Sequence, residues 1–359
     1  MSNKGIGEAT EFTSRSARLG LERRRKRKRK LQAVVLSAVA VVLVAALGAG
    51  YYLFNLAQKF NSQSRSVAIS FTPEQERSRP IKDPEDGSLN MLLLGVDHSD
   101  ESTPTAQETG LETTGQRSDS MMLVHIPETR DEVFVMSIVR DTWLEIPGYG
   151  MNKLNAAVSL GGPALLIQTV EGLFDTKIDH VAMIDFQGFR ELSTALGGVE
   201  VENERAFTAH NTDYFYPQGR ITLEGDRALS FVRERKSFLD GDYQRVKNQR
   251  EFIAAAVDQM LAPGVLTNPG KVYELVDKVS PYLTFDDSFD AATMAGLAMQ
   301  LNNVSSSDIR MFTMPTAGSG TSADGQAIEL ASELAIQQIS EALKTDTMAE
   351  YMELHILEE

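Results

Sequence analysis

The chain has 359 residues and contains no cysteine. It therefore has no disulfides, no thiol nucleophile, no thiolate metal site and no lipid anchor of the lipobox type. The HExxH, GxSxG, P-loop and Rossmann glycine patterns are also missing. The five histidines have no metal-ligand spacing, so each is expected to be solvated or structural. What remains for chemistry is a set of arginines and aspartates.

The formal net charge of −15 hides a strong asymmetry along the chain. Residues 1–30 carry 11 Lys and Arg against 3 Asp and Glu, whereas the remainder carries 24 against 47. An acidic body repels phosphate backbones, which argues against general nucleic-acid binding. Apolar residues make up 42% of the chain, enough for a sizeable core and too many for a disordered protein.

A long apolar stretch follows the basic segment directly. Residues 23–30 are eight consecutive cations, and Leu31–Phe54 is apolar except for Gln32 and Ser37 among polar side chains. As a helix, this stretch would be about 36 Å long, enough to cross a hydrocarbon layer of about 30 Å with some tilt. Because cationic flanks stay in the cytoplasm, we predict a single-pass protein of the cell membrane with a cytoplasmic N-terminus. The rest of the chain is then extracytoplasmic.

Two other interpretations of this N-terminal region stay open. A cleaved signal peptide has an apolar region of about 7–15 residues, which is shorter than the one present here. A basic tail for nucleic acid would not need to lie flush against an apolar span. We therefore favour an uncleaved signal-anchor helix in contact with membrane lipid.

The chain divides into five predicted segments. They are a cytoplasmic basic tail at 1–30, a transmembrane helix at 31–54, an extracytoplasmic stalk at 55–88, one folded domain at 89–345 and a C-terminal tail at 346–359. The stalk is predicted because the segment is polar and punctuated by proline. No linker-like stretch divides the folded domain.

Strands and helices alternate in the predicted domain. Short apolar runs predict buried strands, and the clearest helix is 242–261, whose apolar residues share one face. The remaining strands are predicted at 89–96, 121–126, 133–139, 181–184, 199–202 and 309–314, and the remaining helices at 152–174 with a break at Gly161–Pro163, 186–196, 223–231, 269–279, 288–302 and 328–344. This alternation indicates an α/β or α+β fold in three layers.

Charged residues cluster where the first strands end or begin. Asp97 follows the first buried strand, and Arg117 and Asp119 precede the second. Ligands of open α/β sheets collect at the carboxyl ends of strands. Arg140 follows the third strand and reaches the same edge if that strand runs parallel to the first.

A second group of polar residues lies later in the chain. Arg233 and Arg235 are two residues apart, so in an extended segment their side chains face one way. Asp242, Arg245 and Gln249 share one face of the helix that begins at Asp242. Converging arginines require an anion, and carboxylates beside them suit Mg²⁺, so together they suggest a pyrophosphate site. The alternative is that these charges form ordinary surface ion pairs.

Motifs in a fixed order make the sequence resemble the LytR-CpsA-Psr family of cell-envelope glycopolymer ligases. The resemblance runs from about Leu89 to Leu261 and more loosely to about residue 345. No single motif is specific, but their order is. The main ones are Asn90–Asp97, Arg117–Leu123, Ser137–Asp141, Lys153–Ala156, Asp185–Phe189, Ala195–Val199, Gly225–Leu229, Phe231–Arg235 and Asp242–Arg245.

The resemblance implies a mixed central sheet flanked by helices, with a deep apolar pocket. It also implies that the protein is a phosphotransferase, which moves a glycopolymer from a polyprenyl-pyrophosphate carrier to peptidoglycan as a phosphodiester. The implied metal ligands are Asp97 and Asp119, for Mg²⁺ or in its place Mn²⁺. The implied catalytic set is Asp97, Arg117, Asp119, Arg140 and Asp242, the last as a base or orienting group. The implied pyrophosphate ligands are Arg117, Arg140, Arg233, Arg235, Arg245 and Gln249.

Two rival functions stay open at this point. A non-catalytic envelope regulator or polyprenyl-phosphate-binding module would keep the apolar pocket without needing the two aspartates and the arginines together. A ligase of the same chemistry could instead act on a surface protein. The sequence does not identify the glycopolymer.

Overall fold

The computed structural model describes residues 48–96, 118–238, 241–262 and 264–356. The chain forms two compact units, residues 1–57 and residues 58–359. In the first unit, residues 48–57 are helical, and the rest of the predicted membrane span, 31–47, lies outside the described residues. The second unit begins with helical residues 58–63 and contains all the elements discussed below.

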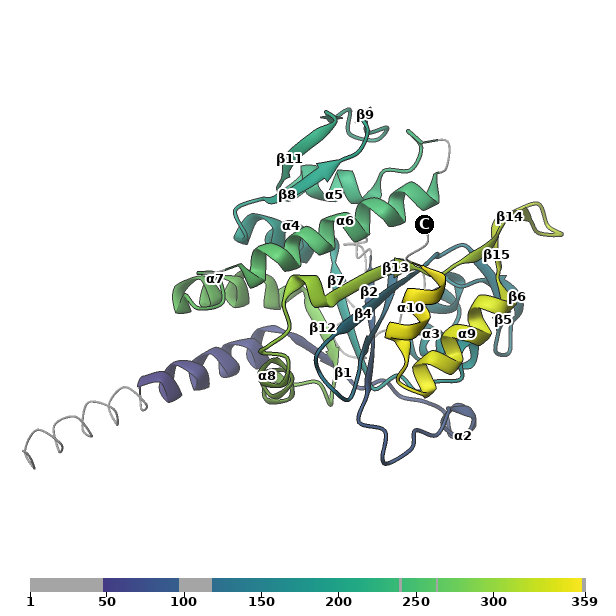
Figure 1. Cartoon of the computed structure of the whole chain (residues 1–359), viewed down its shortest axis with the longest axis horizontal. Helices are drawn as coiled ribbons and strands as arrows, with labels where there is room; N and C mark the ends of the chain where they lie inside the picture. Colours follow the sequence, from purple (N-terminus) through teal and green to yellow (C-terminus); the bar gives the residue numbers. More distant parts are fainter. Residues whose placement is uncertain (1–47, 97–117, 239–240, 263, 357–359) are drawn as a thin grey trace, which may run out of the picture. The chain divides into compact units, whose positions relative to one another are not determined.

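A seven-stranded mixed sheet forms the centre of the second unit (Figure 1). In spatial order its strands are β1 (Arg65–Val67), β12 (Leu283–Asp286), β7 (His180–Asp185), β2 (Leu89–Val96), β3 (Ser118–Ile126), β4 (Val133–Ile138) and β13 (Ile309–Thr313). β2 is parallel to β7 and antiparallel to β3, β3 is antiparallel to β4, and β4 is parallel to β13. β2, β4, β7 and β13 therefore all end at the same edge of the sheet, and β3 begins there.

The described part of the second unit also contains three smaller sheets. A four-stranded sheet contains β14 (Thr316–Thr321), β15 (Ala327–Ala331), β5 (Thr142–Ile146) and β6 (Gly150–Lys153). Two antiparallel pairs are formed by β8 (Val199–Asn203) with β11 (Gly219–Leu223), and by β9 (Phe207–Thr208) with β10 (Phe215–Tyr216).

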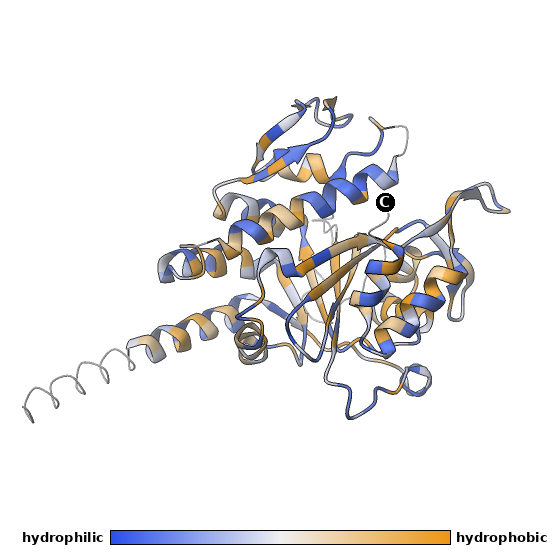
Figure 2. Ribbon diagram, in the orientation of Figure 1, coloured by the Kyte–Doolittle hydropathy of each residue, from blue (hydrophilic) through white to orange (hydrophobic). Residues whose placement is uncertain are grey.

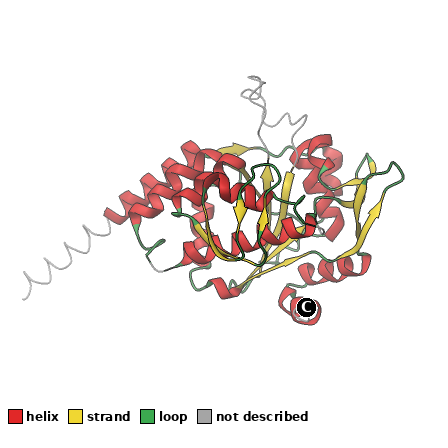
Figure 3. Cartoon of the chain, turned by 90° about the horizontal axis from the view of Figure 1, so that it is seen from above, coloured by secondary structure: helices red, strands yellow, loops and turns green. Residues whose placement is uncertain are grey.

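Helices cover both faces of the central sheet (Figures 1 and 3). On one side lie α3 (Ala156–Phe174), α9 (Glu333–Lys344) and α10 (Met348–His355), and on the other α4 (Phe186–Ala195), α5 (Gly225–Arg233) and α6 (Asp242–Leu261). Successive side chains along β2 point alternately to the two helical layers. Leu92 and Val96 are buried in the core beneath α3, whereas Leu93 and Gly95 face the α4–α6 layer. The remaining helices are α2 (Pro73–Ser78), α7 (Pro269–Val279) and α8 (Ala291–Gln300).

Several predicted elements are confirmed. α6 begins and ends at the predicted residues, and α7 also has its predicted bounds. The break in the long helix is present in α3, where Gly161 and Gly162 leave the helical conformation before Pro163. Gly162 has φ 68°, a value that side chains disfavour, so glycine is needed at this kink. The three-layer α/β architecture with a mixed sheet is likewise confirmed.

One helix prediction is wrong at its start. Residues 328–344 were predicted as a single helix, but Ala327–Ala331 forms β15 and the helix begins at Glu333, after its N-cap Ser332. β15 lies between β14 and β5, so pairing on both sides decides the conformation of a short segment.

The segments predicted as a stalk and a tail are folded in their described parts. Between residues 58 and 88, β1 pairs with β12 and α2 has a capping box at Thr72. In the predicted tail, Met348 and Tyr351 of α10 are buried in the main core. Short elements such as these are stabilised by tertiary contacts, which composition does not reveal.

α3 is the one helix, among the residues that the structure describes, that is long and apolar enough to cross a membrane. Of its most apolar window, 56% is buried within the protein. Its Leu166 and Val170 belong to the core beneath the sheet. α3 is therefore accounted for as a core helix, and it does not bear on the predicted N-terminal span.

A buried ion pair connects the segment before β2 to α3. The Arg79 guanidinium donates to both carboxylate oxygens of Glu171 at 2.8 and 2.9 Å, and the backbone N–H of Ile178 donates to the same carboxylate at 2.9 Å. Glu171 is 1% exposed. The pair joins residues that are 92 positions apart in the sequence.

We expect Glu171→Gln to lower the free energy of unfolding by about 3 kcal/mol, because it breaks a buried ion pair. The matched control is Glu76→Gln, since Glu76 contacts the same Arg79 at 3.4 Å but its side chain is 60% exposed. That change should cost less than about 1 kcal/mol. Urea denaturation of both variants measures the difference, and equal costs would contradict the structural role of Glu171.

Candidate active site

The functional residues gather at the sheet edge where β2, β4 and β7 end. Val96 is the last residue of β2, and Arg140 lies in the turn that follows β4. The condition for Arg140 to reach the edge reached by β2 is therefore met. Asp97 and Arg117, which adjoin this edge in sequence, lie outside the described residues.

A β-bulge marks the start of β3. Gly95 pairs with Ser120 and Val96 pairs with Ser118, so Asp119 is the extra residue between two consecutive partners. Bulges bend a strand locally and re-aim side chains, and they are frequent beside active sites. Asp119 thus has its backbone at the end of β2, although its side chain is outside the described set.

The first turns of α6 carry an ion-pair network at the same edge. Arg245 Nη2 lies 2.7 Å from Asp242 Oδ2, and Arg140 Nε lies 3.8 Å from Asp242 Oδ1. Burial raises the pKa of Asp242 above its ordinary value, whereas Arg245 and Arg140 act to lower it. Gln249, two turns into α6, is buried and donates to the carbonyl of Val232 at 3.2 Å. The structure therefore brings Arg140, Asp242 and Arg245 together as a network of ion pairs, and their binding of pyrophosphate stays a prediction.

Arg233 and Arg235 differ in burial from Glu234, the residue between them. Arg233 is the last residue of α5, so the extended conformation predicted for this segment begins only at Glu234. Both arginines are exposed, whereas Glu234 is buried and accepts backbone N–H groups of His210 and Ser237. Arg233 lies over the ring of Phe186 at 4.1 Å, and the charge of Arg235 acts on Asp242. Arg233 therefore contacts α4 beside the charged edge, and the binding of pyrophosphate by Arg235 stays a prediction.

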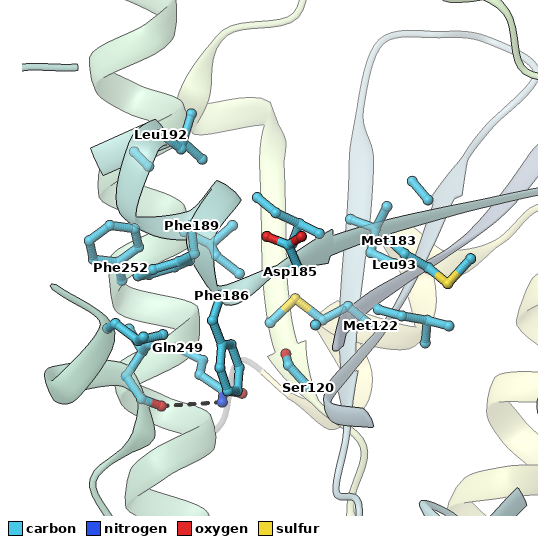
Figure 4. Close-up of a pocket in the computed structure, with 18 of the residues that line it drawn as sticks. Leu93, Ser120, Met122, Met183, Asp185, Phe186, Phe189, Leu192, Gln249 and Phe252 are labelled. Carbon is cyan, nitrogen blue, oxygen red and sulfur yellow. Dashed lines mark hydrogen bonds between the residues drawn. The ribbon is translucent and has the colours of Figure 1, made fainter. Parts of the chain in front are cut away.

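An apolar pocket begins beside this charged edge (Figure 4). Its volume is about 290 Å³. β2, β3 and β7 provide its floor with Leu93, Met122 and Met183, and α4 and α6 provide walls with Phe189 and Phe252. Arg233, Gln249, Asp185 and Ser120 add the polar groups of the lining. The pocket suits a long apolar ligand with an anionic end.

α6 is divided to match the two parts of the site. Its N-terminal half carries the charged residues and is hydrophilic, whereas its C-terminal half is mostly apolar (Figure 2). Ile253, Ala256, Val257 and Met260 of that second half line the pocket. One helix therefore spans both the charged edge and the apolar cavity.

The family model for LytR_cpsA_psr matches residues 56–345 of this chain. The chain belongs to the LytR_cpsA_psr family. The resemblance inferred from the ordered motifs is thereby confirmed. This assignment covers the central sheet, the charged edge and the apolar pocket.

Curated relatives agree with the family assignment, and a solved structure shares the fold. The chain is 30% identical over 319 residues to the polyisoprenyl-teichoic acid–peptidoglycan teichoic acid transferase TagU of Oceanobacillus iheyensis, covering 85% of this chain and 91% of that protein. It is 35% identical over 216 residues to the probable cell wall biosynthesis protein LcpB of Corynebacterium glutamicum, covering 59% and 51%. The crystal structure of B. subtilis TagV superposes with a TM-score of 0.60 at 22% identity, covering 74% and 98%.

Two polar residues of this LytR_cpsA_psr protein were not singled out from the sequence. Asp185 ends β7 at the charged edge, lines the pocket and caps α4 by accepting the Gly188 N–H at 2.8 Å. Lys153 lies 3.1 Å from Asp141, the residue after Arg140. Both residues lie within motifs on which the family resemblance is based. Their position in these motifs is the sequence feature that could have indicated a functional role.

No group of three or more His, Asp or Glu able to hold a metal occurs among the residues that the structure describes. The predicted ligands Asp97 and Asp119 are not among the side chains described. The backbone is nevertheless compatible with the predicted pair. The bulge puts Asp119 at the end of β2, and Asp97 is the next residue of the chain after that strand.

The pocket predicts how binding of an isoprenoid depends on Ala256. This residue is 4% exposed and lines the cavity, so Ala256→Phe fills space that a prenyl chain would occupy. Each displaced CH₂ costs about 0.8 kcal/mol, so farnesol should bind at least about tenfold more weakly. Fluorescence competition measures the affinity.

Ala254→Phe is the control for this change, because Ala254 is exposed on the same helix. It should leave farnesol affinity within about twofold of the original. Equal affinities for both variants would show that the cavity is not the prenyl site.

Proposed function

We propose that the protein is a membrane-anchored phosphotransferase that moves a glycopolymer from a polyprenyl-pyrophosphate carrier to peptidoglycan, forming a phosphodiester. The observation that supports this most directly is the apolar pocket lined at one part by Arg233 and Gln249 and adjoining the network of Arg140, Asp242 and Arg245. The prenyl chain would occupy the pocket, and the pyrophosphate would lie at the charged edge.

The energetics favour a lipid carrier as the substrate. Holding a prenyl chain in water would cost about 0.8 kcal/mol for each exposed CH₂, whereas the pocket offers an apolar lining. Relatives named as polyisoprenyl-teichoic acid–peptidoglycan transferases agree with a lipid-linked donor and a peptidoglycan acceptor. They also agree with the prediction that the protein is an enzyme.

In the proposed reaction, a hydroxyl of the acceptor attacks the phosphorus that bears the glycan. The bond from that phosphorus to the bridging oxygen breaks, polyprenyl phosphate leaves, and the hydroxyl proton passes to a base. Phosphoryl transfer depends mainly on positioning and charge stabilisation, so a covalent nucleophile is not required. Arg233, Arg235 and Arg245 would stabilise the charge that develops on the leaving phosphate.

Asp242 would accept the proton or orient the attacking hydroxyl. A general base works best when its pKa is near the working pH, and burial moves the pKa of Asp242 upward from its ordinary range. Arg140 and Arg245 hold the carboxylate in place from two sides. Asp242 is therefore the described carboxylate that best fits this role.

Asp97 and Asp119 would hold a divalent cation, Mg²⁺ or in its place Mn²⁺. Carboxylates with phosphate oxygens are the usual ligands of protein-bound Mg²⁺, and the cation would offset the charge of the pyrophosphate. The support in this chain is the β3 bulge, which brings Asp119 to the end of β2. Arg117, two residues before Asp119, would add a further pyrophosphate contact.

Our first functional test concerns the carboxylates. Asp97→Ala and Asp119→Ala should each reduce transfer at least about 100-fold, because charge stabilisation at the phosphate is lost. A chelator should reproduce the loss, and added Mg²⁺ should restore the wild-type chain only. Full transfer in the presence of chelator would contradict the metal role, and a fully active pair of variants would favour a different site.

Arg235 offers a test of pyrophosphate binding. A charged hydrogen bond is worth about 1.5–3 kcal/mol, so Arg235→Ala should weaken binding of a polyprenyl pyrophosphate about 10- to 150-fold. Arg235→Lys should recover only part of this, because lysine lacks the planar guanidinium fork. Arg205→Ala is the control, since Arg205 is exposed in the loop before β9. A lower melting temperature with unchanged lipid affinity would instead indicate a structural role.

The membrane topology is tested with protease added outside intact cells. The chain beyond about residue 60 should be degraded, whereas a tag on the N-terminus should be protected, because the basic flank keeps that end in the cytoplasm. Immunoblotting against both ends gives the readout. A protected C-terminus would contradict the orientation and, with it, peptidoglycan as the acceptor.

A further inference from the structure

A second cavity lies next to the apolar pocket and differs from it in chemistry. Its volume is about 340 Å³. It is formed by α4, α5 and the turn between β9 and β10, through residues that include Arg190, Asn211, Tyr214 and Ser230. Most of the lining residues carry a hydroxyl, amide or charged group, whereas the first pocket is mostly apolar. An isoprenoid would therefore not be favoured here.

The two cavities meet at α5. Leu229 and Arg233, one helical turn apart, line both of them. The guanidinium of Arg233 lies 4.1 Å from the ring centre of Phe186, which belongs to the apolar pocket. A ligand whose pyrophosphate contacts Arg233 can therefore place its lipid in the apolar pocket and the group at its other end in the second cavity.

The charges around the second cavity are balanced. Arg190 pairs with Asp226 at 2.6 Å, and the lining also contains Arg233 and Glu234. Two cations and two carboxylates leave no excess of positive charge to attract a further phosphate. The same groups, with the hydroxyls of Thr212 and Ser230, provide donors and acceptors for a neutral, polyhydroxylated ligand.

The turn between β9 and β10 is held in place before any ligand binds. Thr212 Oγ1 lies 2.6 Å from Ser230 Oγ of α5, and the backbone N–H of Ala209 donates to the carbonyl of Tyr214 at 2.9 Å. The guanidinium of Arg227 lies 5.2 Å from the ring centre of Tyr214. Such preorganisation lowers the entropy lost on binding.

We propose that this cavity is a saccharide subsite, which rests on the proposed function because it places a sugar beside the pyrophosphate. The sugar has two sources of the same chemistry. It is either the first residue of the donor glycan or a residue of the peptidoglycan acceptor. In both cases Asn211 hydrogen-bonds to the sugar, and Arg233 marks the boundary between the carbohydrate and the lipid.

The test uses Asn211→Trp in the full chain, purified in detergent. Asn211 is exposed in the turn and lines the cavity, so a tryptophan there obstructs the subsite without entering the core. Gln218→Trp is the matched control, because Gln218 is an exposed amide residue seven positions further on, outside the cavity lining. Asn211→Ala is the milder variant, for which the loss of one neutral hydrogen bond predicts about a 2- to 10-fold effect.

Three probes distinguish the outcomes. They are undecaprenyl pyrophosphate, the same lipid bearing one N-acetylhexosamine, and a soluble peptidoglycan fragment as acceptor. If the sugar is the donor's, Asn211→Trp weakens binding of the sugar-bearing lipid at least about tenfold and leaves the sugar-free lipid unchanged. If it is the acceptor's, both lipids bind normally and the KM for the peptidoglycan fragment rises by a similar factor.

Unchanged values for all three probes would overturn the subsite while leaving the proposed function intact. Equal weakening of both lipids would also overturn it, since the cavity would then act on the pyrophosphate or on folding rather than on a sugar. If the wild-type chain fails to bind the sugar-free lipid, the proposed function itself is wrong, and the subsite falls with it.

Discussion

The candidate site depends on the position of Asp242 between two arginines. Arg140 comes from the turn after β4 and Arg245 from α6, and the carboxylate joins the end of the sheet to the helix that crosses it. Burying a carboxylate is costly unless it is paired, so the network requires both elements to be in place. The same contact directs the polar half of α6 to the charged edge and its apolar half to the pocket.

Much of the architecture could be predicted from local patterns. The bounds of α6 can be predicted because its apolar positions recur on one face. The edge at which Arg140 lies depends on the direction of β4, which the structure shows to be parallel to β2. The family followed from the order of short motifs. The signal for the helix is local, whereas the signal for the family is spread from about Leu89 to Leu261.

Other features depend on residues that are far apart in the sequence. Arg79 and Glu171 are 92 positions apart, and neither has a local pattern that indicates a buried ion pair. The local sequence of β15 favours a helix. It forms a strand because it pairs with β14 on one side and β5 on the other. The second cavity joins Arg190, Asn211 and Ser230 from three separate elements, and no spacing reveals that they meet.

The pairing of β1 has a mechanical consequence. β1 is parallel to β12, and just before it Phe60 contacts Phe285 of β12 while Lys59 pairs with Asp277 of α7. A force directed along β1 would load its hydrogen bonds to β12 in shear, because the two strands are parallel. Three strand positions, a ring contact and an ion pair therefore share the load where the chain enters the sheet.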